Sequence, residues 1–505
     1  MSSDSLGIGK VAIVVIVVII IIIAGVGGYL AVTVKSSTTT TTSPPTSTTS
    51  SAVVASSSTT SSVTTTSSSF SYPVVANISS SAMQALYPST PVTINEYAWS
   101  GYPPSTMVTQ FEAALPNIHV AQTPDQNPSG LLSSLETHTY VYDSFRIQYL
   151  QLPQEISTGE VANITSYINS YFPDLKTEIA ASAQTLVDGG SPGSFYCIPE
   201  DLGPVALNYN TAIFSEYHLD VPTTWAQFAN DSQVLHSENA SIYMTVFPVN
   251  EPSGDLMGLF WQAGGNMITP VNSTAYNVII NSTTNLNVIN YWGNLINAGD
   301  VQSINLYSNQ FNSELAGGEI ASFPYAAAWY PEFVVQSTAP GQSGEWRAAP
   351  MPQWAGVDGI NANANVTGVV GGSCMGVTAN AKNPGAAVLF GYYIDQTVNA
   401  IPWMWVNGGQ WTSNTNYLKT VSNFTQPNTY FGGQNIGAVY IQSQEDVNPN
   451  WVWSPFEITL QTILQNYLNE AASKQITYAQ ALQYTETTMI GIVQDNGYTV
   501  AGVGQ

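Results

Sequence analysis

The chain has 505 residues, of which 44% are apolar and 8% are charged, and its 8 Lys and Arg against 32 Asp and Glu give a formal net charge of −24. A chain this acidic is not expected to bind the phosphates of a nucleic acid. Its two arginines, Arg146 and Arg347, also argue against a site built for phosphate or carboxylate ligands. The length predicts at least two lobes. The scarcity of bases fits an acid medium, and it fits the composition of a lineage equally well.

The first predicted element is an uncharged apolar stretch at residues 11–34, behind a short N-terminal segment at residues 1–10. A helix of this length spans the roughly 30 Å of a bilayer core, whereas a secretory signal has a shorter apolar region. The pattern therefore favours a retained transmembrane anchor over a removed signal. Residues 35–75 are mostly Ser and Thr and cannot bury a core, so we expect a disordered or O-glycosylated stalk there.

Asn-x-Ser/Thr sequons recur along the rest of the chain. Beside a mucin-like stalk, they indicate the outside of a cell. The candidates for N-glycosylation are Asn77, Asn163, Asn230, Asn239, Asn272, Asn281, Asn365 and Asn423. We therefore predict a protein of the cell membrane with a single N-terminal helix and an extracellular globular part.

In the globular part, strands are predicted from apolar patterning at residues 92–97, 118–120 and 140–142. Helices are predicted at residues 105–115, 221–236, 456–472 and 478–493, with another starting at Asn383-Pro384. The helix at residues 221–236 has Thr224 as its cap, with Gln227 three residues on. Strands that alternate with helices imply α/β lobes.

Residues 195–210, FYCIPEDLGPVALNYN, read as two strands with an acidic elbow between them. The first strand meets Pro199, then Glu200 and Asp201, and a Gly-Pro step follows that bends the backbone and limits its flexing. We interpret the elbow as a crossover between two lobes, with its acids at the mouth of a ligand cleft. An ordinary surface turn between two strands of one sheet is the alternative.

The elbow resembles the first hinge of the family 1 extracellular solute-binding proteins of ABC importers, the maltose-binding-protein-like group. Other segments resemble motifs of that family in the same order, over roughly residues 91 to 500. They are residues 219–225 (LDVPTTW), 260–265 (FWQAGG), 317–321 (GGEIA), 346–352 (WRAAPMP) and 370–373 (VGGS). The loop at residues 327–330 lacks the usual Gly-x-Trp, and residues 405–450 match poorly.

The resemblance implies a bilobed α/β fold of the periplasmic-binding-protein type II. Its hinges would lie at Pro199, Gly203, Gly371, Gly372 and Ser373. Lobe 1 would comprise residues 76–200 and 374–425, and lobe 2 residues 201–373 and 426–505. The implied function is to capture a neutral mono- or oligosaccharide between the lobes and deliver it to the permease and ATPase subunits of an ABC transporter. Archaeal members would be expected to carry an anchor and stalk of this kind.

Candidate sugar contacts follow from the chemistry of pyranose rings, whose apolar faces pack on aromatic rings and whose hydroxyls need acceptors and donors. The candidates are Trp99, Asp143, Glu200, Asp201, Trp261, Trp329, Tyr330, Trp451 and Trp453. For the tryptophans, burial in the core is an equal alternative. For Asp143, the alternative is a helix cap ahead of residues 144–150.

The resemblance also places the only two cysteines, Cys197 and Cys374, on crossover strands that run side by side in the family's architecture. We therefore expect a disulfide, which an external compartment permits and which would tie the two hinge strands together within one lobe. Two buried free thiols are the alternative.

Two rival classes of function remain at this stage. A glycoside hydrolase could assemble its acids from distant loops, although Glu200 and Asp201 are adjacent rather than separated across a bond. Neither a cofactor nor a metal is expected, because the histidines show no metal-ligand spacing; they are His119, His138, His218 and His236. A structural cell-surface glycoprotein would suit the anchor and stalk, but not the hinges.

Overall fold

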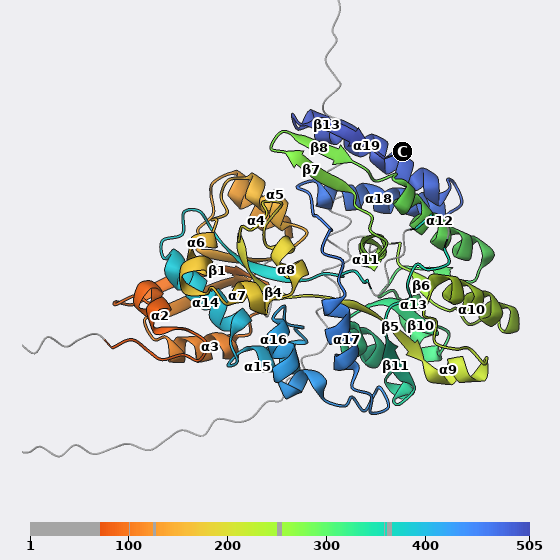
Figure 1. Ribbon diagram of the computed structural model, residues 1–505, viewed down its shortest axis with the longest axis horizontal. Coiled ribbons are helices and arrows are strands. Elements are labelled where there is room, and N and C mark those ends of the chain that lie inside the picture. The colour runs from red at the N-terminus through yellow and green to blue at the C-terminus, as the bar shows by residue number, and fades with distance from the viewer. Residues whose placement is uncertain are drawn as a thin grey trace, which may run out of the picture. The chain divides into compact units, whose positions relative to one another are not determined.

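The first sheet of the computed structural model has the strand order β2-β1-β3-β12-β4 (Figure 1). β1 pairs in parallel with β2 and β3, whereas β12 is antiparallel to β3 and β4. The strands are β1 (Val92–Ala98), β2 (Ile118–Pro124), β3 (Ser144–Gln148), β4 (Cys197–Asp201) and β12 (Ser373–Val377). The sheet therefore joins strands from before the first predicted hinge with one strand from after the second.

Helices cover the first sheet on both of its faces (Figure 1). They are α2 (Ser80–Leu86), α3 (Ser105–Ala114), α4 (Pro128–Glu136), α5 (Leu152–Ser157), α6 (Thr165–Tyr171), α7 (Leu175–Glu178), α8 (Ala181–Leu186), α14 (Pro384–Gln396), α15 (Ile401–Gly408) and α16 (Thr415–Thr420). Every residue of α14 from Ala386 to Gln396 is buried, so this helix lies inside the lobe. The ring of Phe390 on α14 lies edge-on to that of Phe111 on α3, with 4.9 Å between centroids.

The second lobe is built on the antiparallel sheet β10-β5-β11, a two-stranded sheet β6-β9 and a three-stranded sheet β13-β8-β7. Its strands are β5 (Val205–Asn210), β6 (Val246–Phe247), β7 (Ile268–Asn272), β8 (Ala275–Val278), β9 (Gln302–Ser303), β10 (Ser322–Ala327), β11 (Trp346–Ala349) and β13 (Thr499–Val503). Its helical segments are α9 (Thr211–Glu216), α10 (Trp225–Glu238), α11 (Met257–Gln262), α12 (Thr283–Ala298), α13 (Asn309–Gly317), η3 (Pro331–Gln336), η4 (Pro340–Gln342), α17 (Ile436–Glu445), α18 (Glu457–Ala472) and α19 (Tyr478–Asp495). The short η5 (Ser422–Thr425) packs against α15 and α16 of the first lobe and against α17 of the second.

The structure describes residues 71–99, 102–124, 128–249, 255–357, 359–360 and 366–504. The predicted anchor, nearly all of the predicted stalk and the sequon at Asn365 lie outside these ranges. Within them, no helix combines the length and the apolar character needed to cross a membrane.

Local signals predicted four of the long helices, α10, α14, α18 and α19, but not the 16-residue α12. The predicted cap of α10 is present. The hydroxyl of Thr224 accepts a hydrogen bond from the backbone amide of Gln227, and the side chain of Gln227 accepts one from the backbone amide of Thr224. Proline at the first helical position begins α14 as expected. The predicted closing helices are α18 and α19, each within two residues of its predicted ends.

The predicted strand at residues 140–142 is wrong, and so is the alternative of a helix at residues 144–150. The chain stays irregular through Tyr142, and the strand β3 begins at Ser144. Val141 is exposed, so the apolar letters of this segment do not mark a core. The side chain of Asp143 accepts hydrogen bonds from two backbone amides just before the ladder starts, and thereby fixes where β3 begins.

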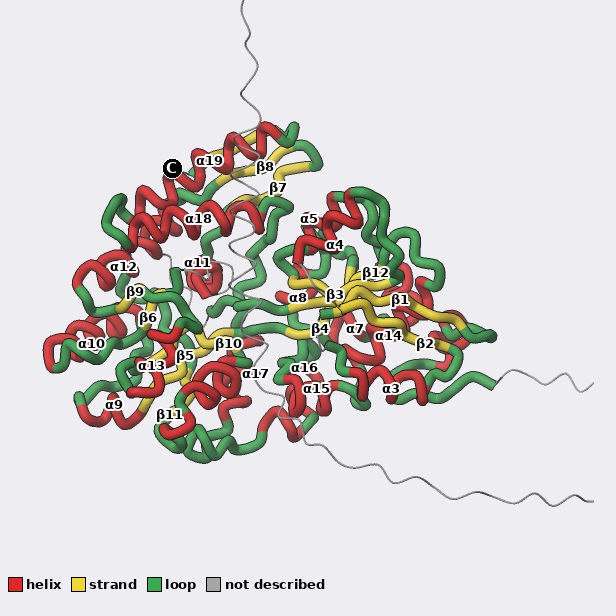
Figure 2. Tube along the Cα trace, turned by 180° about the vertical axis from the view of Figure 1, so that it is seen from behind, coloured by secondary structure: helices red, strands yellow, loops and turns green. Residues whose placement is uncertain are grey.

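The elbow is a crossover between sheets, as predicted, since β4 belongs to the first sheet and β5 to the second (Figure 2). The second crossover runs antiparallel beside it. The amide of Val370 donates to the carbonyl of Gly203 at 2.8 Å, and Pro204 bridges to Val369. A Cβ on Gly203 would lie 1.8 Å from the carbonyl oxygen of Val370, so only glycine allows this approach.

The predicted disulfide is confirmed. Cys197 on β4 and Cys374 on β12 are bonded, with their Cα atoms 5.7 Å apart. Both are fully buried, and their strands are neighbours in the first sheet. The bond therefore ties the strand that enters the first crossover to the strand that leaves the second, inside one lobe.

Candidate ligand-binding site

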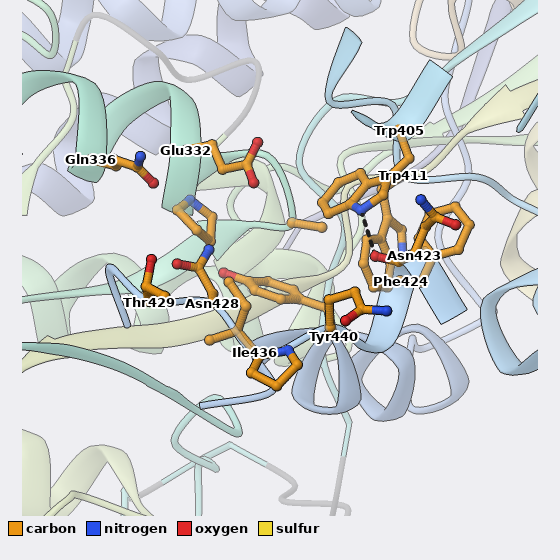
Figure 3. Close-up of a pocket in the computed structure, with 15 residues that line it drawn as sticks. Glu332, Gln336, Trp405, Trp411, Asn423, Phe424, Asn428, Thr429, Ile436 and Tyr440 are labelled. Carbon is orange, nitrogen blue, oxygen red and sulfur yellow. Dashed lines mark hydrogen bonds between the residues drawn. The ribbon is translucent and has the colours of Figure 1, made fainter. Parts of the chain in front are cut away.

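A cavity of about 320 Å³ is lined by residues from both lobes (Figure 3). The segment after β10 contributes Ala328, Pro331, Glu332 and Gln336, while α15 and the segment after it contribute Trp405 and Trp411. The remaining lining residues are Asn423, Phe424, Gln426, Pro427, Asn428, Thr429, Ile436, Gly437 and Tyr440.

Aromatic rings form one continuous wall of this cavity. Trp405 and Phe424 are stacked at 5.4 Å, and the Trp411 ring lies edge-on to both, at 5.3 Å from Trp405 and 5.5 Å from Phe424. Tyr440 on α17 continues the wall, 5.9 Å from Trp411. Ring pairs of this geometry support one another, which gives the cavity a rigid apolar side.

Hydrogen bonds fix the polar atoms of the wall. The Trp405 Nε1 donates to the carbonyl of Asn423 at 3.1 Å (Figure 3), and the Trp411 Nε1 donates to the Gln444 Oε1 at 2.9 Å. The hydroxyl of Tyr440 accepts from the Asn208 Nδ2 at 3.0 Å. Burial raises the pKa of Tyr440 well above its ordinary value, so this residue stays neutral. With these polar atoms engaged, the wall offers mainly aromatic carbon to a ligand.

The opposite side of the cavity is polar and carries no base. Glu332 and Gln336 approach from η3, with Asn428 and Thr429 below them (Figure 3). None of the described residues that line it is Lys, Arg or His. The cavity thus combines an aromatic wall with amide, hydroxyl and carboxylate groups, which suits a ligand that carries hydroxyls and no negative charge.

None of the sugar-binding candidates chosen from the sequence lines this cavity. Trp329 and Tyr330 come closest in the chain, since Ala328 and Pro331 on either side of them do line it. Trp329 is half-buried with its ring 4.7 Å from that of Tyr330. Tyr330 is fully buried and donates its hydroxyl to Asp255, so it supports the loop from beneath.

Three other candidates form a buried cluster in the second lobe. The rings of Trp261 and Trp451 are stacked at 5.3 Å, and Trp453 lies edge-on to both. Trp261 is 1% exposed, Trp451 2% and Trp453 8%. The alternative of burial in the core describes these three tryptophans in this structure.

Asp143 also has a structural place. It is 2% exposed, and its two carboxylate oxygens accept from the amides of Asn95 at 2.9 Å and Lys382 at 2.7 Å. A carboxylate engaged on both sides by backbone amides has little capacity left for a ligand. Trp99, by contrast, is half-buried at the end of β1, 6.5 Å from the ring of Tyr102, and remains a candidate.

Glu200 belongs to a buried ionic cluster centred on Arg146. The guanidinium donates to Glu96 at 2.9 Å, to Glu200 at 2.7 Å and to Asp395 at 3.1 Å, and all four side chains are buried. Burial raises the pKa of each of the three carboxyls, and the charge of Arg146 opposes that rise. One cation cannot neutralise three buried anions, so the cluster retains protons.

Asp201 faces the second crossover instead. The hydroxyl of Ser373 donates to its Oδ1. Burial and the neighbouring charge of Glu200 raise the pKa of Asp201 to about 7. Both acids of the elbow are therefore engaged inside the first lobe and at the hinge, and neither lines the cavity described above.

Sequence reasoning missed the residues of the aromatic wall because they lie where the family motifs are not recognisable, within residues 405–450. The sequence IPWMWVNGGQW at residues 401–411 did carry a signal for a ligand site, because its tryptophans lie close to Asn, Gln and Gly residues. Another part of the lining, Ala328 and three residues of η3, is distant in the chain from the wall and is brought close to it only by the fold.

Two sheets joined by paired crossovers, with a cavity lined from both sides, define the bilobed α/β architecture of a periplasmic binding protein. The chain belongs to the family of bacterial extracellular solute-binding proteins, whose model matches residues 84–395. A search of curated proteins gave no match.

Solved structures share the fold across most of the chain. An ABC transporter associated binding protein from B. animalis subsp. lactis Bl-04, in complex with β-1,6-galactobiose, has a TM-score of 0.65 at 22% identity, over 82% of this chain and 100% of that one. The galacto-N-biose-/lacto-N-biose I-binding protein from Bifidobacterium longum, in complex with lacto-N-biose, has a TM-score of 0.68 at 20% identity, over 81% of this chain and 99% of that one. The sugar-binding protein MalE from Xanthomonas citri has a TM-score of 0.66 at 15% identity, over 80% of this chain and 98% of that one.

Proposed function

We propose that this solute-binding protein captures a neutral sugar in the cavity between its lobes and delivers it to the permease of an ABC transporter. The observation that carries the proposal is the lining of the cavity, which joins an aromatic wall to uncharged polar groups and one carboxylate without any base. The disaccharide ligands of the two bifidobacterial structures agree with a sugar of this class. Catalysis forms no part of the proposal.

The chemistry of the cavity matches a pyranose ring. The C–H face of a sugar packs on aromatic carbon, here offered by Trp405 and Phe424, while its hydroxyls find acceptors and donors in Glu332, Gln336 and Asn428. The half-buried Trp99 and Trp329 are proposed as additional contacts nearer the rim.

The setting of the protein is also a proposal. We infer an extracellular globular part held by the apolar helix at residues 11–34, with the lobe boundaries predicted from the sequence. Of the sequons within the described ranges, Asn77, Asn163, Asn230 and Asn272 are exposed and open to glycosylation, whereas Asn239 and Asn281 are half-buried and Asn423 lines the cavity.

Binding of neutral disaccharides, β-1,6-galactobiose and lacto-N-biose first, should be detectable by calorimetry with the chain from Tyr72 onward. Trp405→Ala should weaken binding about tenfold or more, equivalent to roughly 1.4 kcal/mol, because it removes the ring of the wall that is only half-buried. Tyr484→Ala is the matched control, since this exposed tyrosine lies on α19. Binding that Trp405→Ala leaves unchanged would place the sugar elsewhere.

Charged sugars provide a second test. A phosphorylated sugar should bind more weakly than its neutral parent, because the described lining holds a carboxylate and no cation to offset the phosphate. Competition calorimetry with glucose 6-phosphate against glucose, and with a phosphorylated disaccharide against its parent, measures the difference. Tighter binding of the phosphorylated form would contradict the proposed site.

Ligand should also change the angle between the lobes. The paired crossovers at Gly203 and Val370 are the connections about which a bilobed binding protein bends. Small-angle scattering should show a smaller radius of gyration with saturating sugar than without it. If calorimetry shows binding but the radius of gyration does not fall, closure about these hinges is excluded.

A further inference from the structure

We propose that the cavity prefers an amino sugar, which carries an ammonium group, over the same sugar with a hydroxyl in that place. Glu332 supplies the counter-charge, and the rings of the aromatic wall add their attraction for a cation. The inference rests on the proposed function, because it concerns the ligand of the same cavity. It extends that function from neutral sugars to their cationic analogues.

Glu332 is the one carboxylate among the described residues that line the cavity. It makes no side-chain hydrogen bond and no ion pair within the described part of the chain. Burial raises its pKa, and neither a charge nor a hydrogen bond of a described residue opposes that rise. The side chain is still partly exposed, so a ligand can reach it. A cationic ligand would therefore gain this carboxylate as a partner without breaking a contact inside the protein.

The protein's own cations do not compete for this position. None of the bases in the described ranges lines the cavity. Arg146 is held by three buried acids of the first lobe, and Lys419 pairs with Glu445. Arg347 donates to two backbone carbonyls close to it in the chain. The counter-charge for the cavity carboxylate therefore has to come from solvent or from the ligand.

The contacts of η3 fix where Glu332 stands relative to the aromatic wall. A Cβ on Gly409 would lie 2.1 Å from the ring of Phe333, so this ring packs directly on the end of α15. Glu332 precedes Phe333 in the chain, and α15 carries Trp405. The hydroxyl of Tyr430 also donates, at 2.6 Å, to a backbone carbonyl just beyond η3. In Figure 3 the carboxylate of Glu332 points toward the side of the cavity on which Trp405 lies.

The lining offers an ammonium group more than it offers a hydroxyl. A cation within about 6 Å of a ring face is attracted by the ring, most strongly when the ring is tryptophan. Trp405 and Trp411 both belong to the wall. An ammonium also donates three hydrogen bonds where a hydroxyl donates one, and the oxygens of Glu332, Gln336 and Asn428 are acceptors for them. Exchange of one hydroxyl for an ammonium therefore adds an ion pair while the shape of the sugar stays nearly the same.

The binding test measures three matched pairs by calorimetry at pH 6.5, where the sugar amines are protonated. The pairs are glucosamine with glucose, galactosamine with galactose, and the β-1,4-linked disaccharide of glucosamine with cellobiose. In the pair that binds most tightly, the amino sugar should bind about tenfold more tightly than its neutral partner, the gain expected for one charge-assisted contact of roughly 1.4 kcal/mol. Raising the salt to about 1 M should reduce this gain, because salt screens a partly exposed carboxylate.

Two variants assign the gain to Glu332. Glu332→Gln keeps the size of the side chain without its charge, so the two sugars of a pair should bind it with equal affinity. Glu319→Gln, at an exposed position outside the cavity in the same lobe, should keep the wild-type ratio. Denaturant unfolding of Glu332→Gln should match that of wild type, because the carboxylate has no described partner to lose.

The outcomes separate this inference from the proposed function. Equal affinity of wild type for the two sugars of every pair, or a gain that survives in Glu332→Gln, would overturn the inference. If neutral sugars then still bind and Trp405→Ala weakens them, the proposed function stands alone. Failure of every sugar to bind, neutral or amino, would reject the proposed function and the inference with it.

Discussion

Replacing Cys197 and Cys374 together by alanine is expected to lower the free energy of unfolding by on the order of 5 kcal/mol. The disulfide joins residues 177 positions apart, and a cross-link that closes so long a loop removes much of the entropy of the unfolded chain. Both cysteines are fully buried, so the variant also loses contacts inside the sheet. Denaturant unfolding of both proteins under non-reducing conditions measures the difference.

Two controls sharpen this test. Wild-type protein unfolded in the presence of reductant should lose a similar amount of stability, which separates the bond itself from the alanine side chains. Sugar affinity at a temperature where the variant is folded should stay within about twofold of wild type, because the bond lies within one lobe and leaves rotation of the other free. A loss below about 1 kcal/mol would show that the unfolded chain gains little freedom without the bond.

The parts of the fold that the sequence predicted are those fixed by local signals. The capping box of α10, the proline that starts α14 and the Gly-Pro break after β4 each act within a few residues, so their patterns can be read in one segment. The pairing of the two crossovers and of the cysteines spans the whole second lobe. It followed only from resemblance to a family whose crossovers run side by side, and the structure bears it out.

The site was predicted less well because residue type does not show whether an aromatic ring lines a cavity or is buried in the core. Trp261, Trp451 and Trp453 are chemically as suited to a sugar as Trp405 and Trp411, yet the first three pack against one another inside a lobe. The difference lies in contacts between segments some 190 positions apart, as between Trp261 and Trp451. Asp143 shows the same limit, since its backbone partners come from β1 and from the segment ahead of α14.

Acidic pH should stabilise the folded chain, and Glu155 should account for a large part of the effect. Its carboxyl is buried, its Oε2 has no hydrogen-bond partner among the described residues, and burial, aided by the charge of Glu136, raises its pKa from 4.5 to about 8. The folded state therefore binds this proton more tightly than the unfolded state. The resulting stability is fully present below about pH 4.5 and is lost as pH rises to 8; the whole shift corresponds to roughly 5 kcal/mol.

Denaturant unfolding at pH 5 and pH 8 tests this prediction. Wild type should be less stable at pH 8, and Glu155→Gln should lose roughly 4 kcal/mol less over the same interval, because its amide does not ionise. Glu216→Gln, at an exposed position on α9, should follow wild type. Glu457, whose pKa burial raises to about 7, acts in the same direction and accounts for part of the slope that remains. Equal slopes for wild type and Glu155→Gln would mean that water or a cation reaches this carboxyl in the folded protein, whereas the predicted difference would connect the scarcity of bases in this chain to buried acids that are held neutral.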